Sequence, residues 1–320
     1  MEENTEQRVD LTLFSEKIQE LKDRIASVIV GQEQTVDLVL TAILANGHVL
    51  IEGVPGVAKT LLARLTARLI DADFSRVQFT PDLMPSDVLG TTVFNMKTNG
   101  FDFHQGPIFA DIVLVDEINR APAKTQAALF EVMEERQISI DGTTHRMGDL
   151  YTILATQNPV EQEGTYKLPE AQLDRFLMKI TMDYPSLEEE VNILERHHTN
   201  AALVKLDDIT PAITKEELLS LRAFMNQVFV LQYIALIVQQ TRTSKAVYLG
   251  ASPRASVAML QSSKAYALLQ GRDFVTPEDI KFVAPYVLQH RLILTAEAEM
   301  EGYSPVKVTQ RLIDKVEVPK

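Results

Sequence analysis

A glycine-containing loop that ends in lysine and threonine constrains the fold of this chain more than any other feature. It follows the apolar run His48-Val49-Leu50-Ile51 and reads Glu52-Gly53-Val54-Pro55-Gly56-Val57-Ala58-Lys59-Thr60. The run is typical of a buried strand, and leucines at helical spacing after the loop predict a helix from Thr60 to Ile70. A strand that turns through glycines into a helix directs several backbone N–H groups to one point, where phosphate can bind. The stretch therefore predicts a phosphate-binding loop.

The loop departs by one residue from the usual pattern G-x-x-x-x-G-K-[ST]. Gly53, Lys59 and Thr60 fit the pattern, but Ala58 takes the place of the second glycine. Alanine still allows a phosphate to approach, provided that its φ is negative. Lys59 would then reach the β- and γ-phosphates, and the Thr60 hydroxyl would bind Mg²⁺. The alternative is an ordinary Gly/Pro turn between a strand and a helix.

Length and composition bound the class of protein. A chain of 320 residues is long enough for two domains, which we expect over residues 1–184 and 185–320. The acidic start of the chain is unlike a secretory signal, and the longest apolar run, Val228 to Val238, is far shorter than a membrane span. The absence of cysteine is typical of a cytoplasmic protein. A formal charge of −13 argues against a general nucleic-acid surface, although a local basic patch in an oligomer's pore stays open.

Two carboxylates follow the apolar run Ile112 to Val115. Four branched apolar residues in a row are typical of a strand buried on both faces of a parallel sheet. Open α/β sheets place their ligands at the C-terminal ends of such strands. We therefore expect Asp116 to hold Mg²⁺ and Glu117 to act as the general base toward water. Two solvated acids at a strand end are the alternative.

Two further polar residues stand beside predicted strands. Asn158 follows the strand Tyr151 to Thr156, where an amide can hydrogen-bond both a water and the γ-phosphate; a plain Asn-Pro turn is the alternative. Arg175 precedes the strand Phe176 to Ile180. Its guanidinium could reach a neighbouring subunit, or it could form a surface ion pair with Asp174.

Two hairpins and a helical second half complete the predicted elements. Asn99-Gly100 and Asp141-Gly142 each lie between alternating runs, which predicts hairpins over Thr92 to His104 and Gln137 to Met147. Beyond Tyr184-Pro185 the pattern predicts helices and no further strands. The predicted helices are Leu187 to His198, Lys215 to Asn226, Phe229 to Arg242, Pro253 to Gln270 and Pro277 to Leu294. Thr276-Pro277 resembles an N-cap with proline at the first helical position.

The motifs occur in the order found in AAA+ ATPases, and their residues closely resemble those of the MoxR family. The resemblance extends over essentially the whole chain, from Val30-Gly31-Gln32 to Val318-Pro319. Alanine before the loop lysine is common in that family, and the two hairpins match insertions in an AAA+ group that includes magnesium chelatase and MCM helicases. The stretches that carry the resemblance are Glu52–Thr60, Gln105–Phe109, Asp116–Thr125, Asn158, Glu170–Phe176 and Gly250–Ala255.

The resemblance implies an α/β fold: an AAA+ P-loop core with a parallel sheet and two inserted β-hairpins, followed by an all-helical lid. It implies a homo-oligomeric ring, expected to be a hexamer, that hydrolyses ATP with Mg²⁺ at its subunit interfaces. Nucleotide contacts would come from Val30, Gly31, Gly53, Val54, Pro55, Gly56, Val57, Ala58, Lys59, Thr60 and Leu61. Ile29 and Val30 are expected to pack on the adenine. Thr60 and Asp116 would hold Mg²⁺, and Glu117, Asn158, Arg175 and Arg254 would be catalytic. Arg175 would be the finger supplied by the adjacent subunit, whereas the sensor arginine Arg254 could serve either subunit.

The family also implies a chaperone-like role with a partner that carries a von Willebrand A domain and a protein client. The cycle would mature a protein or insert a metal or cofactor. Two alternatives remain: a nucleic-acid motor or loader related to MCM-like proteins, and a nucleotide-gated assembly switch. The hairpins offer few basic residues for phosphate contacts, which makes nucleic acid the weaker choice.

Overall fold

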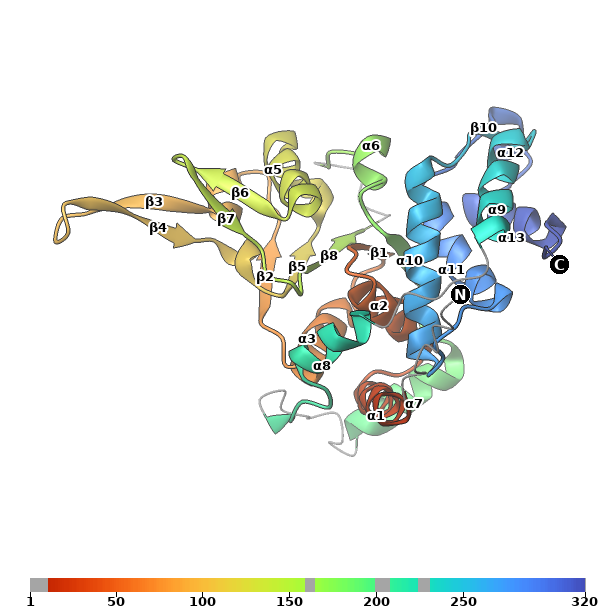
Figure 1. The fold of residues 1–320 in the computed structure, drawn as a ribbon, viewed down its shortest axis with the longest axis horizontal. Coiled ribbons are helices and arrows are strands. Elements are labelled where there is room, and N and C mark those ends of the chain that lie inside the picture. The colour runs from red at the N-terminus through yellow and green to blue at the C-terminus, as the bar shows by residue number, and fades with distance from the viewer. Residues whose placement is uncertain (1–10, 159–164, 199–207, 224–230, 320) are drawn as a thin grey trace, which may run out of the picture.

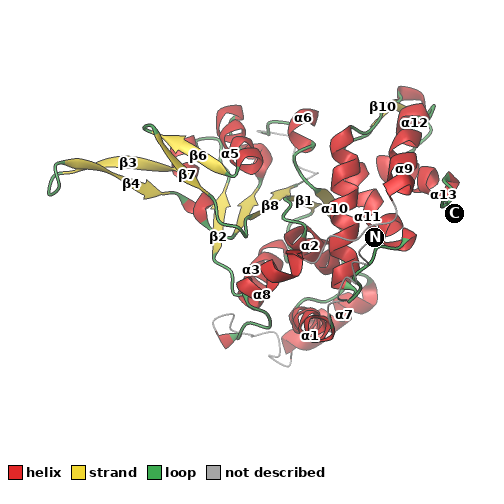
Figure 2. Ribbon diagram, viewed as in Figure 1, coloured by secondary structure: helices red, strands yellow, loops and turns green. Residues whose placement is uncertain are grey.

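A computed structural model describes residues 11–158, 165–198, 208–223 and 231–319. Its centre is a five-stranded parallel sheet with the strand order β2-β5-β8-β1-β9 (Figure 2). The strands are β1 (Val49–Gly53), β2 (Phe74–Gln78), β5 (Ile112–Asp116), β8 (Thr152–Gln157) and β9 (Met178–Met182). Because all five run in the same direction, the loops after β1, β5 and β8 meet at one edge of the sheet.

The strand residues divide between two apolar clusters, one on each face of the sheet. On β5, Ile112 and Leu114 belong to one cluster, whereas Val113 and Val115 belong to the other. This alternation follows from the two-residue period of a strand, and burial of both faces explains the unbroken apolar run.

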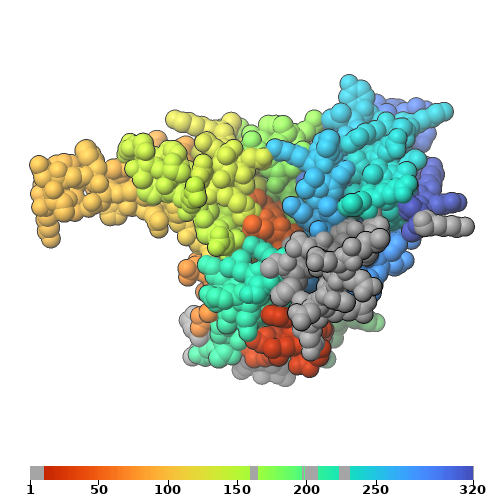
Figure 3. Space-filling view, in the orientation of Figure 1, coloured from red at the N-terminus to blue at the C-terminus, as the bar shows by residue number. Residues whose placement is uncertain are grey.

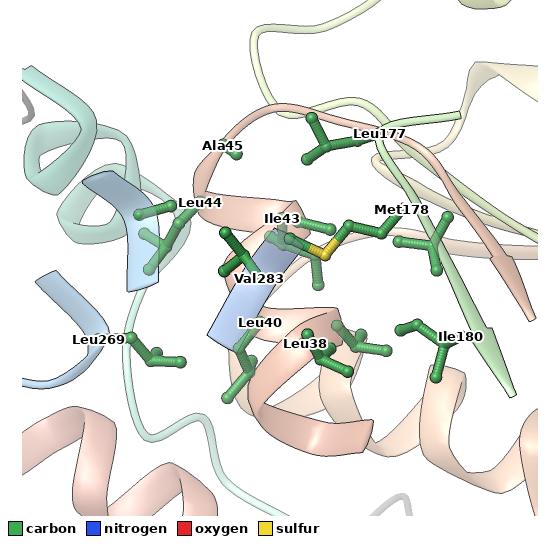
Figure 4. Packing of buried hydrophobic residues seen from close by; sticks show 14 of the residues in the cluster. Leu38, Leu40, Ile43, Leu44, Ala45, Leu177, Met178, Ile180, Leu269 and Val283 are labelled. Atoms are coloured by element: carbon green, nitrogen blue, oxygen red, sulfur yellow. The ribbon is translucent and has the colours of Figure 1, made fainter. Parts of the chain in front are cut away.

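Helices from both halves of the chain cover the first face. These are α2 (Glu33–Leu44), α3 (Lys59–Leu69) and, from the second half, α11 (Pro277–Leu288), while α10 (Pro253–Leu269) packs on α2 and α11. Figure 4 shows side chains of α2 packed between Met178 and Ile180 of β9 and Val283 of α11. The two halves therefore share one hydrophobic core, and the expected boundary between residues 184 and 185 stays a prediction.

The other face is covered by α5 (Ala123–Glu135), which follows β5. Buried His48 connects this helix to the strands: its Nε2 lies 3.1 Å from the Met133 carbonyl oxygen, and its Nδ1 accepts from the Ile153 N–H at 3.0 Å. The second contact identifies Nδ1 as the unprotonated nitrogen, so the ring is neutral and Nε2 donates to Met133. Burial accordingly lowers the pKa of His48 to about 3.

Both predicted hairpins are present. The first pairs β3 (Gly90–Asn95) with β4 (Gly100–Gln105) and follows the short helix α4 (Pro85–Leu89). The second pairs β6 (Gln137–Ile140) with β7 (Thr143–Arg146) through Asp141-Gly142, both at positive φ as a tight hairpin turn requires. The first hairpin projects from the body as an arm (Figures 1 and 3).

The second half is helical, as expected, but the last predicted helix differs from the prediction. The predicted helix over Pro277 to Leu294 ends at Leu288, and the chain returns as β11 (Ile293–Leu294), antiparallel to β10 (Val247–Leu249). Tertiary contacts explain the early end: Arg291 pairs with Asp174 and donates to the Phe176 carbonyl, which turns the chain toward the sheet. The prediction of no strand beyond residue 184 is therefore wrong, because β10 and β11 form a short two-stranded ribbon.

The remaining helices are α1 (Thr12–Val28), α6 (Glu170–Leu173), α7 (Leu187–His198), α8 (Lys215–Ala223), α9 (Leu231–Thr243), α12 (Ala296–Met300) and α13 (Pro305–Lys315), with 3₁₀ turns η1 (Pro107–Phe109) and η2 (Ile118–Arg120). Helices α1, α2, α5, α12 and α13 and strand β2 were not predicted. The Thr276 cap is confirmed, because Asp279 accepts from the Thr276 N–H at 2.7 Å. Residues 224–226 of one predicted helix, residues 229–230 of the next and residue 228 of the apolar run lie outside the described residues. Within the described ranges, no helix has the length and apolar character needed to cross a membrane.

Candidate active site

The phosphate loop joins β1 to α3, as the sequence predicts. Gly53 permits the close approach of β9, since a Cβ at Gly53 would lie 2.7 Å from the Met182 carbonyl oxygen. Gly56 has a φ of 91° and Ala58 a φ of 61°. The condition of a negative φ at Ala58 is therefore not met: the turn into α3 needs a left-handed residue there, which is why glycine is usual at this position.

Lys59 opens α3 and lies against the loop. Its Nζ donates to the carbonyl oxygens of Gly53 at 2.6 Å and Val54 at 3.3 Å. Partial burial lowers the pKa of Lys59, while the nearby charges of Asp116 and Glu117 act to raise it. The ammonium, the helix N-terminus and the Thr60 hydroxyl lie on the same turn, and such a donor set fits a phosphate.

A cavity of about 290 Å³ adjoins the loop. It is lined by Val28, Ile29, Val30, Gln32, Gly56, Val57, Ala58, Leu61, Pro185, Ile193 and Arg196. The lining is mostly apolar and includes Ile29 and Val30, which we expected to pack on adenine. Gly31 is not among the lining residues; its φ of 70° turns the chain there, and a Cβ would collide with the Glu189 carboxylate. The cavity suits an aromatic base next to a phosphate site.

Asp116 ends β5 with its side chain almost fully buried. Its Oδ2 accepts from Arg76 Nε at 2.6 Å, and its Oδ1 accepts from the Thr156 hydroxyl at 3.1 Å. Strand β5 ends at the same sheet edge as β1, so Asp116 and Thr60 reach this edge together. Carboxylate and hydroxyl oxygens are ligands that Mg²⁺ prefers, and the pair fits this metal.

Glu117 lies just beyond the strand in a left-handed conformation, with a φ of 57°. This conformation is costly for a residue with a side chain. The Glu117 N–H donates to the Thr156 hydroxyl at 3.0 Å, and the Glu117 carboxylate accepts from Gln78 Nε2 at 2.8 Å and pairs with Arg120 Nε at 3.0 Å. Asn158, half-buried, follows β8 at the same edge. Four predicted residues therefore share one edge of the sheet: Lys59, Asp116, Glu117 and Asn158.

The two predicted arginines lie at the opposite edge. Arg175 lies three residues before β9, at the end of the sheet where β1 and β9 begin, and there the Leu177 N–H donates to the His48 carbonyl. Arg254, on the first turn of α10, bonds Glu134 Oε1 at 2.6 Å, and Arg175 pairs with Glu134 Oε2 at 3.7 Å. The alternative pair of Arg175 with Asp174 is not what the structure has, because Asp174 pairs with Arg291 at 2.6 Å. A five-residue strand, about 17 Å at 3.3 Å per residue, separates this edge from the protein's own phosphate loop.

Sequence reasoning missed the residues that hold these side chains: Arg76, Gln78, Arg120, Glu134 and Thr156. Gln78 does have a local signal, since it ends β2 at the sheet edge where β5 ends with Asp116. The others show no pattern in the sequence that singles them out.

Comparison with known proteins agrees with this geometry. Residues 48–178 match the ATPase family associated with various cellular activities (AAA), and residues 239–314 match the AAA lid domain. Chaperone MoxR1 of Mycobacterium tuberculosis is 44% identical over 305 residues, covering 92% of this chain and 81% of its own length. Protein MoxR of Methylorubrum extorquens is 31% identical over 315 residues, covering 91% of each chain. The crystal structure of a candidate ATPase from Cytophaga hutchinsonii has a TM-score of 0.89 and 40% identity, covering 97% of each chain.

Fold and phosphate loop together define the AAA+ class of ATPases. Within that class, the similarities to the MoxR proteins show that the chain belongs to the MoxR family. The predicted fold class, an AAA+ core with a helical lid, is thereby confirmed.

Proposed function

We propose that this chain forms a homo-oligomeric ring that hydrolyses MgATP at its subunit interfaces and uses the cycle to remodel a partner protein. One observation carries the proposal: the phosphate loop and the two arginines lie at opposite edges of the sheet. A single subunit separates them by about one strand length. A second subunit, placed with its arginine edge against the first subunit's loop, would complete the site, and a head-to-tail contact of this kind closes into a ring.

At the loop edge, each residue has a definite task. Lys59 and the N–H groups of the loop bind the phosphates, and Thr60 and Asp116 hold Mg²⁺, which when bound neutralises phosphate charge. Glu117 accepts a proton from the attacking water, and Asn158 orients that water. Gln78 and Arg120 hold the Glu117 carboxylate, so its direction is set by two neighbours.

At the opposite edge, Arg175 and Arg254 serve the neighbouring subunit's nucleotide. Both guanidinium groups carry positive charge that can stabilise the transferring phosphoryl group. Arg254 bonds Glu134 beside Arg175, at the edge about one strand length from its own loop, so of the two choices left open by the sequence we favour action on the neighbour.

The first hairpin supports a protein client over nucleic acid. Phe94 and Phe101 pair edge to face at 5.2 Å between ring centroids on one face of the hairpin, and both are exposed. Met96 at the tip is 89% exposed. Apolar side chains that project on an arm suit contact with a polypeptide, whereas a phosphate backbone needs lysines and arginines. Following the family, we propose a von Willebrand A domain partner and a role in maturation or in metal or cofactor insertion.

The first test measures ATP binding and turnover of three variants. Glu117→Gln should bind ATP and fail to hydrolyse it, because the base is lost. Arg175→Ala should bind ATP normally but lose about 10³–10⁵-fold in turnover, the usual worth of an arginine finger. Arg311→Ala, remote on α13, is the control and should turn over normally. Normal turnover in Arg175→Ala would remove this residue from the site.

The second test captures partners with the Glu117→Gln variant from native extract, with and without ATP. An ATP-dependent von Willebrand A protein would support the remodelling role. Nuclease-sensitive nucleic acid would contradict it and favour a motor. Assembly of the chain with itself alone, together with absent turnover in the unsubstituted protein, would favour the nucleotide-gated switch.

A further inference from the structure

One carboxylate joins the two arginines at the far edge. Glu134, in the last turn of α5, pairs with Arg254 Nη2 at 2.6 Å through Oε1 and with Arg175 Nε at 3.7 Å through Oε2. Arg175 comes from the core and Arg254 from the lid, 79 positions apart in the sequence, so no local pattern brings them together. Both side chains remain partly exposed, at 31% and 54%.

The backbones that carry the two arginines are fixed to each other by a different set of contacts. Asp174 pairs with Arg291, whose side chain is only 4% exposed, and accepts from the Ser252 hydroxyl at 3.2 Å. This cluster anchors the residue before Arg175 and the residue before the first turn of α10. The backbone positions of Arg175 and Arg254 are therefore fixed without Glu134.

The charged ends of the arginines depend on α5. Phe130, one turn before Glu134 on the same helix, has its ring centroid 6.0 Å from the Arg175 guanidinium carbon. Phe130 supports this group by cation–π attraction, while Glu134 pairs with both guanidinium groups and offsets their mutual repulsion. Long, partly exposed side chains have many rotamers, and a shared carboxylate selects those in which the two cations lie together.

We propose that Glu134 is a positioning residue, which holds Arg175 and Arg254 as one array directed at the nucleotide of the neighbouring subunit. This inference rests on the proposed function, in which the arginines act across the subunit interface. Glu134 touches neither phosphate nor water in this scheme. It acts through the arginines, by reducing the rearrangement that they need before they can stabilise the reaction.

A subunit-mixing experiment tests the inference. Donor subunits carry Glu117→Gln, which keeps both arginines but removes hydrolysis in the donor's own site. Receiver subunits carry Arg175→Ala with Arg254→Ala, which keeps an intact site but removes the arginines. Neither form should turn over ATP alone, whereas the mixture should, because donor arginines complete receiver sites.

Glu134→Gln is then added to one subunit type at a time. In the donor it should lower kcat of the mixture about 100-fold, the scale of a small misplacement of a catalytic group, with KM for ATP nearly unchanged. In the receiver it should change nothing. Glu135→Gln in the donor is the matched control, an exposed glutamate on the same helical turn, and should leave turnover unchanged. Glu134→Asp in the donor, which keeps the charge, should recover part of the lost rate.

The outcomes distinguish the positioning role of Glu134 from the proposed action of the arginines across the subunit interface. If the mixture with native Glu134 shows no turnover, the action of the arginines across the interface is refuted and the inference falls with it. If that mixture is active but insensitive to Glu134→Gln in the donor, only the inference is refuted. A loss of equal size in the receiver would show a general structural effect and would also refute it. Thermal unfolding of the variant checks that the donor is folded.

Discussion

Thr156 offers the sharpest test of how the carboxylates of Asp116 and Glu117 are held. Its hydroxyl accepts from the Glu117 N–H at 3.0 Å and donates to Asp116 Oδ1 at 3.1 Å, and its side chain is 2% exposed. Thr156→Val keeps the shape and removes both bonds. A buried N–H without an acceptor costs about 1–3 kcal/mol, and a hydrogen bond to a charged group contributes about 1.5–3 kcal/mol. We expect the free energy of unfolding to fall by about 2–4 kcal/mol, since part of each loss is recovered by relaxation.

The same strand supplies a matched control. Thr152, fully buried on β8, has a hydroxyl with no hydrogen-bond partner among the described residues. Thr152→Val therefore removes only a buried, unsatisfied polar group, and stability should stay the same or rise by about 1 kcal/mol. Urea unfolding of both variants at neutral pH measures the difference, and steady-state hydrolysis should fall for Thr156→Val alone.

Equal destabilisation by the two substitutions would refute this reasoning. It would mean that the loss comes from placing valine on this strand, and that the Thr156 hydroxyl does not hold Asp116 and Glu117. Thr156→Ser, which keeps the hydroxyl, should retain most of the stability and turnover. A loss as large as that of Thr156→Val would also refute the role of the hydroxyl.

Two further predictions concern buried and strained residues. Burial lowers the pKa of His48 to about 3, so between pH 6.5 and 3 the unfolded chain binds a proton at His48 and the folded chain does not. The contribution of His48 to the free energy of unfolding is therefore complete above pH 6.5. It declines as the pH falls toward 3, with a slope of up to about 1.4 kcal/mol per pH unit. Urea midpoints between pH 6 and 4 should therefore depend less on pH in His48→Gln, and an unchanged slope would contradict the assignment. Ala58→Gly should remove strain of about 1–2 kcal/mol at a φ of 61°, partly offset by the greater chain entropy of glycine, whereas Ala58→Val should destabilise. Thermal unfolding compares the two, and a loss of stability in Ala58→Gly would show that Ala58 is not strained.

Local pattern was sufficient to predict several of the elements and the loop edge of the site. The apolar run before Asp116 predicted a doubly buried strand, and Asp141-Gly142 predicted a tight turn, because each signal resides in a few adjacent residues. The parallel sheet then brings the ends of β1, β5 and β8 together without further information. That is why Lys59, Asp116, Glu117 and Asn158 could be grouped in advance.

What could not be predicted depends on contacts between distant segments. The helix α11 ends at Leu288 because Arg291 pairs with Asp174, which is 117 positions away in the sequence. Glu134 is one of several acidic residues in a helix, and nothing nearby distinguishes it from Glu135. The positive φ of Ala58 could not be foreseen for a different reason: the geometry of the turn, and not the size of the side chain, decides the backbone conformation there.

The sheet that separates the two edges also connects them. Its strands are hydrogen-bonded along their length and packed on both faces, so they neither stretch nor bend easily. Strand β1 carries the phosphate loop at one end, and β9 beside it begins three residues after Arg175. In a ring, each subunit would thus act as a rigid strut, and a displacement at one nucleotide would reach the next site around the circle as a movement of its arginines.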